Sequence, residues 1–532
     1  MIRKLIDLSI QHRGIVLFAS ALLAVWGAWA LVNTPIDAIP DLSDTQVIIY
    51  SQWKGRDPET IEKQVTYPIT TKMLSIPNSK VVRAFSNYSY SLIYIIFEDG
   101  TDIYWARSRV LEYLSTIAGQ LPEGVTTSLG PDATGVGWVY QYTLEDTSGK
   151  YDLGELRAIQ DWYIRYALTT VPDVAEVASL GGFPRQFQVI VDPAKLFSLD
   201  ISLEHVMDAV KMGNNDIGGA TVEVAEREKL VKGSGYIKTI ADLENIVIET
   251  RNGVPITVRE VAKAVIIGSE MRRGIAEKNG TGQVVGGIVV MRFGKNAREV
   301  IDNVKKKIEE ISTGLPPGVV IKPVYDRSAL IDRSIKTLSN QLIEILGMMA
   351  LICIVFLFHF QSALVSWIAL PIGTLIAFII MYFMGVNSNI MSLGGLAIAL
   401  GDMADGAISL VENLHKKLEK HRGALQVSNG NVTSFDSKTH WELVAEAAKE
   451  VGPGIFGSLL VLVVSFLPIF VLSEQAGRLF KPLAYTKTFA LAGGCLMTIT
   501  LIPALMGYFV RGNITPEKKN PVTRFLIGAY LP

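Results

Sequence analysis

Apolar residues gather near the two ends of this chain. Gly14–Val32 is an apolar run long enough to cross about 30 Å of hydrocarbon, and basic residues precede it. Five further apolar runs lie at about residues 341–360, 363–384, 390–413, 453–473 and 485–510. The pattern predicts six transmembrane helices, with one long polar stretch between the first and the second.

Charge distribution indicates how these helices are oriented. The first run is too long for a signal peptide and lacks a small-residue cleavage pattern, so we expect a retained helix with a cytoplasmic N-terminus. Basic residues follow the fourth run in the loop His415–Lys449, and others follow the sixth run. Positive charge favours the cytoplasmic side, so the polar stretch from about 33 to 336 is predicted to lie outside.

The polar stretch has the pattern of mixed α/β structure. Val47–Gln52 and Leu92–Phe97 alternate as strands do, while Pro58–Lys72 and Asp102–Ile117 have helical periodicity. The order β-α-β-β-α is typical of a split βαβ sandwich. The chain is therefore predicted to be an α+β membrane protein.

Two signals recur downstream and indicate a second, related unit. Ile76-Pro77 before a strand is repeated by Val171-Pro172, and Leu121–Val125 after a helix is repeated by Leu315–Val319. Strands are predicted at Gln186–Val191 and Val284–Phe293. The segment Ser202–Ile267 between them has its own helix and strands, and is predicted to be a lobe inserted into the second unit.

Composition supports the membrane class and argues against several others. Of 532 residues, 49% are hydrophobic and 19% charged, with a formal net charge of -1, so nucleic acid is not an expected partner. No Walker-type phosphate loop or hydrolytic constellation is present. We therefore expect no cofactor and no bond-making enzyme activity, and assign no role to Cys353 or Cys495.

The fourth predicted span carries the most informative residues. Asp402, Asp405, Ser409 and Glu412 fall on one helical face. An intramembrane carboxylate costs about 2.5–3.5 kcal/mol on insertion scales, so this face should point into a protein interior and serve as a proton relay. The alternatives are acids that merely pair with a base, and an interfacial, solvated Glu412. Lys487 is placed near the outer end of the sixth span, so the counter-charge is expected to be missing from this chain.

Local sequence motifs connect the chain to a known family. The fourth span ends in Asp-Gly-Ala-x-x-x-x-Glu-Asn, at residues 405–413. Further strings are Asn33–Pro35, Pro40–Asp44, Phe97–Asp102, Tyr104–Leu114, Gly130–Trp138, Glu270–Glu277, Gly294–Ile301 and Asn389–Gly395. With one span, a large external region and five more spans, the whole chain resembles the heavy-metal efflux branch of the RND transporter superfamily, and is most similar to its copper/silver exporters.

The resemblance implies a proton antiporter of the cell inner membrane that exports Cu(I) or Ag(I). It also implies a homotrimer that works with a periplasmic membrane-fusion adaptor and an outer-membrane channel. The polar region would form two ferredoxin-like porter subdomains and a docking lobe. The implied divisions are 1–33, 34–135, 136–199 with 280–335, 200–279 for the lobe, 336–413, the cytoplasmic loop 414–450, 451–511, and 512–532.

Family members are about twice as long, so the sequence is expected to be the N-terminal half. The second half would supply a basic partner for Asp405 and a methionine cluster that binds metal. The resemblance further implies a methionine path through this half. Its residues are Met271, Met391, Met403 and Met506. Leu410 and Leu491 stand where methionines are expected as partners of Met506 and Met403, and flexible apolar packing is the alternative role for each methionine.

Two other functions remain open from the sequence. One is an RND pump for divalent cations such as zinc, cobalt or cadmium, because Asp402 adds a hard carboxylate near Asp405. The other is a SecD-like protein-translocation accessory, which also has six spans and an external region.

Overall fold

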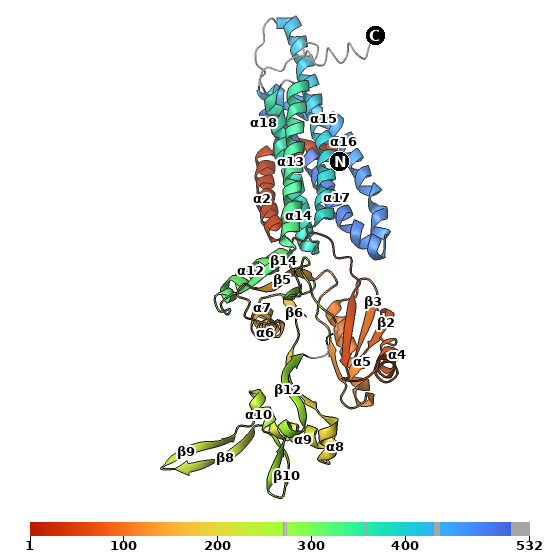
Figure 1. The fold of residues 1–532 in the computed structure, drawn as a ribbon. Helices are drawn as coiled ribbons and strands as arrows, with labels where there is room; N and C mark the ends of the chain where they lie inside the picture. The colour runs from red at the N-terminus through yellow and green to blue at the C-terminus, as the bar shows by residue number, and fades with distance from the viewer. Residues whose placement is uncertain (270–271, 273, 358, 430–436, 512–532) are drawn as a thin grey trace.

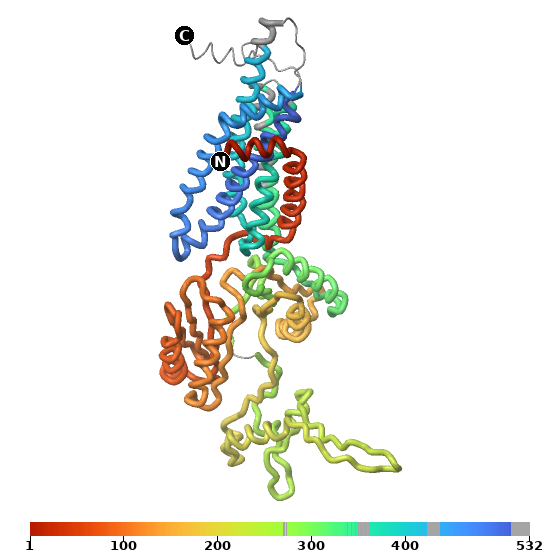
Figure 2. The backbone as a smooth tube through the Cα atoms, turned by 180° about the vertical axis from the view of Figure 1, so that it is seen from behind, coloured from red at the N-terminus to blue at the C-terminus, as the bar shows by residue number. Residues whose placement is uncertain are grey.

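The computed structural model describes residues 1–269, 272, 274–357, 359–429 and 437–511. Figure 1 shows a bundle of long helices, two α/β units beneath it and an extended lobe farthest from the bundle. The reverse view in Figure 2 shows the N-terminal helix lying across the side of the bundle. The predicted C-terminal segment 512–532 lies outside the described residues.

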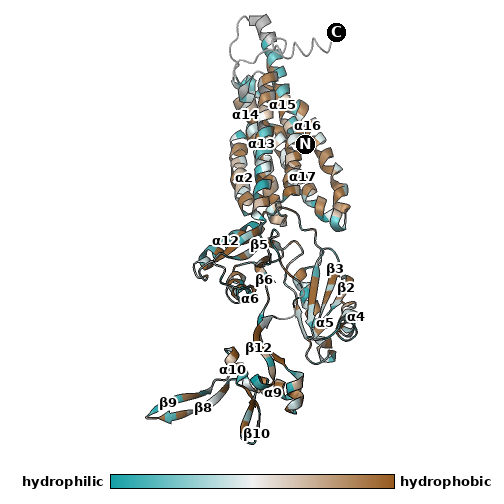
Figure 3. Ribbon diagram, viewed as in Figure 1, coloured by the Kyte–Doolittle hydropathy of each residue, from teal (hydrophilic) through white to brown (hydrophobic). Residues whose placement is uncertain are grey.

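The helical bundle is built from the two ends of the chain. Its elements are α1 (Ile2–Gln11), α2 (Arg13–Asn33), α13 (Ser328–Leu357), α14 (Phe360–Met384), α15 (Ile390–Asn429), α16 (Ser437–Ser465), η4 (Leu467–Val471), α17 (Glu474–Ile499) and α18 (Leu501–Phe509). Hydrophobic residues predominate on these helices and are mixed with hydrophilic ones in the units below (Figure 3).

Four helical stretches of the described chain are long and apolar enough to cross a membrane: Arg13–Asn33, Gln361–Met384, Ile390–Arg422 and Ser437–Val471. The bent pair α17–α18 is a fifth if it forms one span. The run predicted at about 341–360 falls on α13 and on residue 358, which is outside the described residues. The total of six spans therefore stays a prediction.

Two helices differ from their predicted extents. The sixth predicted span is broken, because α17 and α18 meet at an angle of 50°. Pro503 lies in the first turn of α18 and cannot donate a hydrogen bond to Ile499, which favours a break there. The predicted loop after residue 413 is instead largely helical, since α15 continues to Asn429. Glu412–Lys416 ion pairing at 2.6 Å supports that extension.

The first α/β unit has a four-stranded antiparallel sheet in the order β2-β3-β1-β4. Its strands are β1 (Gln46–Gln52), β2 (Ser79–Asn87), β3 (Tyr90–Phe97) and β4 (Thr126–Leu129). Its helical elements are α3 (Pro58–Ile61), η1 (Glu62–Thr66), α4 (Tyr67–Met73), α5 (Ile103–Ile117) and η2 (Ala118–Gln120). Alternate residues of β1, among them Val47 and Ile49, are buried against these helices.

The second unit repeats this arrangement, with a four-stranded antiparallel sheet in the order β14-β5-β13-β6. Its elements are β5 (Trp138–Asp146), α6 (Leu153–Ile159), η3 (Gln160–Ile164), α7 (Arg165–Thr169), β6 (Val174–Gly181), β13 (Val285–Met291), α12 (Ala297–Ser312) and β14 (Val319–Asp326). In each unit the first helix contains a five-residue π-helical segment, η1 or η3. The predicted repeat therefore has a structural counterpart in the two units.

The inserted lobe is carried on a two-stranded stalk, β7 (Arg185–Val191) paired with β12 (Ala262–Ser269). It contains α8 (Pro193–Ser198), α9 (Leu203–Gly213), β8 (Ile217–Val224), β9 (Arg227–Gly233), α10 (Ile240–Glu244), β10 (Val247–Arg251), β11 (Val254–Thr257) and α11 (Val258–Val261). The β8–β9 hairpin projects away from the lobe (Figure 1), and every residue of both strands is exposed.

The helices α15 and α17 approach each other closely through glycines. A Cβ at Gly395 would lie 2.5 Å from the Leu483 carbonyl oxygen, and a Cβ at Gly494 would lie 2.6 Å from Cγ of Met403. Thr486 also donates a hydrogen bond of 2.8 Å to the Ser392 carbonyl oxygen. The two helices are therefore in contact at backbone distance.

Gly395→Ala is expected to destabilise the protein by about 1–3 kcal/mol, because the new methyl group must push the two backbones apart. Gly401→Ala on the same helix is the matched control, since nothing lies within 4 Å of its added Cβ. Alanine has the higher helix propensity, so the control should be neutral or slightly stabilising. Thermal unfolding of the purified protein in detergent compares them, and equal melting temperatures would contradict the close contact.

Candidate proton-transfer site in the membrane bundle

The helix α15 separates its apolar and acidic residues onto different faces. Asn389 caps its first turn, accepting hydrogen bonds of 3.0 Å from the backbone N–H groups of Met391 and Ser392. Ala407 and Leu410 are fully buried in the bundle. The predicted acidic face of α15 lies on the side of the helix that faces away from these buried residues.

Asp402 has an ionic partner, which corrects one sequence-based expectation. Lys487 Nζ on α17 lies 3.0 Å from Asp402 Oδ2, and the exposed fractions of the two side chains are 7% and 29%. The counter-charge predicted to be missing from this chain is therefore present for Asp402. Asp402 Oδ2 is buried and accepts no aligned hydrogen bond from the described residues, so the contact is an ion pair.

Lys487 lies farther along its helix than the sequence indicated, because α17 begins before the apolar run at about 485–510. The lysine belongs to α17, which begins at Glu474, so it lies about 13 residues inside the helix. Its flexible stem carries the ammonium group to Asp402, and the same group lies 4.2 Å from the centre of the Phe466 ring. A lysine at the start of an apolar run, in a chain with acids in another span, was the available signal.

The other acids of the face lie on the surface of the bundle. Asp405 and Ser409 are exposed, so this half of the protein does not by itself supply the interior that is predicted for this face. Glu412 pairs with Lys416 and the two side chains are 46% and 55% exposed, which is typical of a solvated surface pair. Only Asp402 is thus enclosed by other helices of the described bundle.

The methionines of the predicted metal path do not form one cluster. Met403 is 4% exposed and shares an apolar cluster with Leu491. Met506 is fully buried in a second cluster, which contains Leu410. Each methionine thus packs in the same cluster as the leucine that replaces its expected partner. Met391 is partly buried, and Met271 lies outside the described residues.

Carboxylates and imidazoles do not suggest an alternative metal site. Among the described residues, no group of three or more His, Cys, Asp or Glu side chains could hold a metal ion. Any metal site in this part of the chain would therefore rest on thioethers or on fewer ligands.

Charged contacts connect the bundle to the two α/β units. Arg327 Nη2 lies 2.8 Å from Asp37 Oδ1, at the start of α13. Burial raises the pKa of Asp37, and Arg327 only partly offsets that effect. Arg478 on α17 contacts Asp44 at 2.8 Å and also pairs with Asp99. The hydrogen bond from Arg478 lowers the pKa of Asp99.

A long apolar bundle with acids on one helix, joined to paired α/β units, is the architecture of a membrane protein, and its family membership makes it a transporter. The chain belongs to the AcrB/AcrD/AcrF family, whose family model matches residues 5–531. This membership confirms the resemblance to the RND superfamily and argues against the SecD-like alternative.

The similarity to named relatives covers the whole chain. It is 54% identical over 533 residues to the cation efflux system protein CusA of Escherichia coli K12, and 52% identical over 535 residues to the putative cation efflux system protein SilA of Salmonella typhimurium. Identity to the cobalt-zinc-cadmium resistance protein CzcA of Cupriavidus metallidurans is 35% over 541 residues. All of this chain is covered in each case, and 50% of each relative.

A solved structure supports the same conclusion. The crystal structure of a heavy metal efflux pump has a TM-score of 0.80 and 29% identity to this chain, covering 94% of it and 48% of the pump. The chain thus spans about half the length of the proteins it matches.

Proposed function

We propose that this chain is the N-terminal half of a proton-driven heavy-metal efflux pump of the cell inner membrane, with Cu(I) or Ag(I) as the transported ion. The observation that carries the proposal is 54% identity along the whole chain to a cation efflux protein. The acid-bearing helix α15 supplies the chemistry that proton antiport requires.

Protons would be carried by the acidic face of α15. Asp405 is the principal proton carrier, because it is an intramembrane carboxylate and is not enclosed by this half. A second half of the same architecture would cover that face and bring a base to it. Asp402 is neutralised by Lys487 and tunes the charge of the face, while Glu412 would exchange protons at the cytoplasmic end.

Copper and silver are favoured over divalent ions by two considerations. Identity to CusA is 54%, against 35% to a relative named for cobalt, zinc and cadmium resistance. Thioethers are soft ligands that prefer monovalent copper and silver. Because Leu491 and Leu410 lie beside Met403 and Met506, a methionine path in this half would bind metal through single thioethers.

A divalent-cation pump is the second candidate. The sequence favoured it through Asp402 as a second carboxylate near Asp405. In the structure Asp402 pairs with Lys487, and a carboxylate neutralised by a lysine is a poorer ligand for a hard cation, so the argument for divalent ions is weaker.

The external region would form two porter subdomains of the ferredoxin-like type and a docking lobe. Each porter subdomain is one of the four-stranded sheets with its helices. The fully exposed β8–β9 hairpin supports assembly into a homotrimer with an adaptor and an outer-membrane channel. An isolated two-stranded hairpin is at best marginally stable in water, so an assembly partner would stabilise it.

Metal tolerance of a pump-deleted bacterium tests the substrate. The complete gene is expressed with its adaptor and outer channel, and growth is measured in copper, silver, zinc and cobalt. Rescue on copper and silver alone is the expected result. Rescue on zinc or cobalt would instead show that the similarity to copper/silver pumps reflects ancestry and not substrate.

A further inference from the structure

The two α/β units are attached to different helices of the bundle. The first unit, residues 46–129, is held by α17. Arg478 on α17 pairs with Asp44 and Asp99, and its Nη1 donates to the Leu42 carbonyl oxygen at 2.9 Å. Lys80 on β2 adds an ion pair of 2.7 Å to Glu474 at the start of the same helix. We call this group of contacts the α17 joint.

The second unit, residues 138–326, is attached through α13 and the linker that follows α2. Arg327 is 2% exposed and lies between the end of β14 and the start of α13. Its backbone N–H donates to the Val139 carbonyl oxygen at 3.1 Å, and its guanidinium donates to the Val136 carbonyl oxygen and pairs with Asp37. We call this group of contacts the Arg327 joint.

The Arg327 joint also reaches the acid-bearing helix. Ile36 forms a parallel β-bridge with Ser388, directly before the Asn389 cap of α15. The Ile390 N–H at the start of α15 donates to the Ala38 carbonyl oxygen at 3.2 Å. Ala38 is itself buried in the core of the second unit. The linker 36–38 therefore connects the outer end of α15 directly to the second unit.

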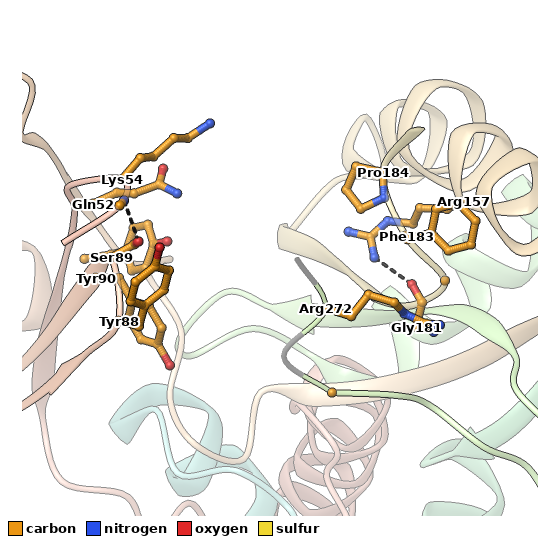
Figure 4. A pocket seen from close by; sticks show the side chains of 14 residues that line it. Gln52, Lys54, Tyr88, Ser89, Tyr90, Arg157, Gly181, Phe183, Pro184 and Arg272 are labelled. Atoms are coloured by element: carbon orange, nitrogen blue, oxygen red, sulfur yellow. Dashed lines mark hydrogen bonds between the residues drawn. The ribbon is translucent and has the colours of Figure 1, made fainter. Parts of the chain in front are cut away.

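A cavity of about 490 Å³ lies between the two units. In Figure 4 its first wall carries Lys54, Tyr88 and Tyr90, and the facing wall carries Phe183 and Pro184. The units are connected near the membrane bundle, where Asp132 pairs with Arg292 at 2.7 Å. A rotation about that connection would change the width of the cavity.

We propose that Arg478 and Arg327 are positioning residues for transport: each makes one unit follow its own helix, so that displacement between α17 and the α13–α15 pair changes the cavity. Packed helices shift by small sliding steps, and a rigid unit converts a small step at its joint into a larger one at its far side. The driving step is protonation on the acidic face of α15, and the Asp402–Lys487 ion pair connects that face to α17. This step rests on the proposed proton antiport.

Pulsed electron resonance in the complete pump tests the proposal. Lys54 and Pro184, which are both exposed and lie on opposite walls, are each replaced by a cysteine that carries a spin label. Cys353 and Cys495 are changed to serine so that they are not labelled. The label separation is measured in neutral and acidic buffer. The wild type is expected to show a shift, Arg478→Ala and Arg327→Ala to lose it, and Arg478→Lys to retain part of it.

Lys322→Ala is the matched control, because it breaks a 2.7 Å ion pair with Glu145 inside the second sheet and should leave the shift unchanged. A wild type without a shift, or an unchanged shift in both arginine-to-alanine variants, would overturn the proposal. So would loss of the shift in the control as well.

If the alanine variants do not fold, a charge-exchange variant decides. Arg478→Asp with Asp99→Arg restores opposite charges at the α17 joint and should keep the shift, whereas Arg478→Asp alone should lose it. Equal behaviour of the single and the double variant would overturn the proposal. Metal tolerance of the wild type is measured in parallel. If the wild type gives no metal tolerance, the proposed function is refuted. If it gives tolerance but the arginine variants keep the full label shift, only this inference is refuted.

Discussion

Asp405→Asn in the complete pump is expected to abolish copper and silver tolerance while the protein stays folded and inserted. The substitution removes the titratable group and keeps the size of the side chain. A carboxylate at mid-membrane costs about 2.5–3.5 kcal/mol on insertion scales, so its removal should not impair insertion. The variant therefore separates proton coupling from folding. Tolerance is measured by growth, and folding by the yield and melting temperature of purified protein.

Two controls make this result specific. Asp405→Glu keeps a titratable carboxyl and should retain part of the tolerance. Glu412→Gln removes a carboxylate that is half-exposed and paired with Lys416. Water can replace it in proton exchange at that exposed end, so the loss of tolerance should be much smaller than in Asp405→Asn. Full tolerance in Asp405→Asn would rule out Asp405 as the proton carrier, and loss in both Asn and Gln variants would assign the relay to the whole face.

Lys487→Met is expected to lower stability strongly, because it leaves Asp402 without its counter-charge inside the bundle. Removing one partner of a buried ion pair costs about 3–5 kcal/mol. The 29% exposure of Asp402 places the expected loss toward the lower end of that range. Thermal unfolding in detergent, compared with the wild type, measures it.

The double variant tests whether the effect belongs to the pair. Lys487→Met with Asp402→Asn removes both charges and should recover most of the lost stability, because no unpaired charge is then buried. Additive losses in the double variant would show that the two side chains act independently. A metal-tolerance assay of the double variant then shows whether the pair is needed for transport or only for folding.

The sequence alone determined the class of this protein and predicted where its chemistry lies. Apolar runs identify the segments that can enter hydrocarbon. Such segments must be helical, because a helix pairs all of its backbone N–H and C=O groups internally. The strand–helix order and the repeated Pro and Gly signals likewise predicted two α/β units with an insertion between Val191 and Val284. The acids at 402 and 405 stood out because carboxylates are costly in an apolar span.

Only the tertiary structure decided which of these acids has a partner. Lys487 and Asp402 are 85 positions apart in the chain, and helix periodicity carries no information on which helix packs against which. The close approach of α15 and α17 through Gly395 and Gly494 brings the two charges together. The same limit applies to Arg327 with Asp37 and to Arg478 with Asp99, because ion pairs between distant segments depend on packing that no local pattern encodes.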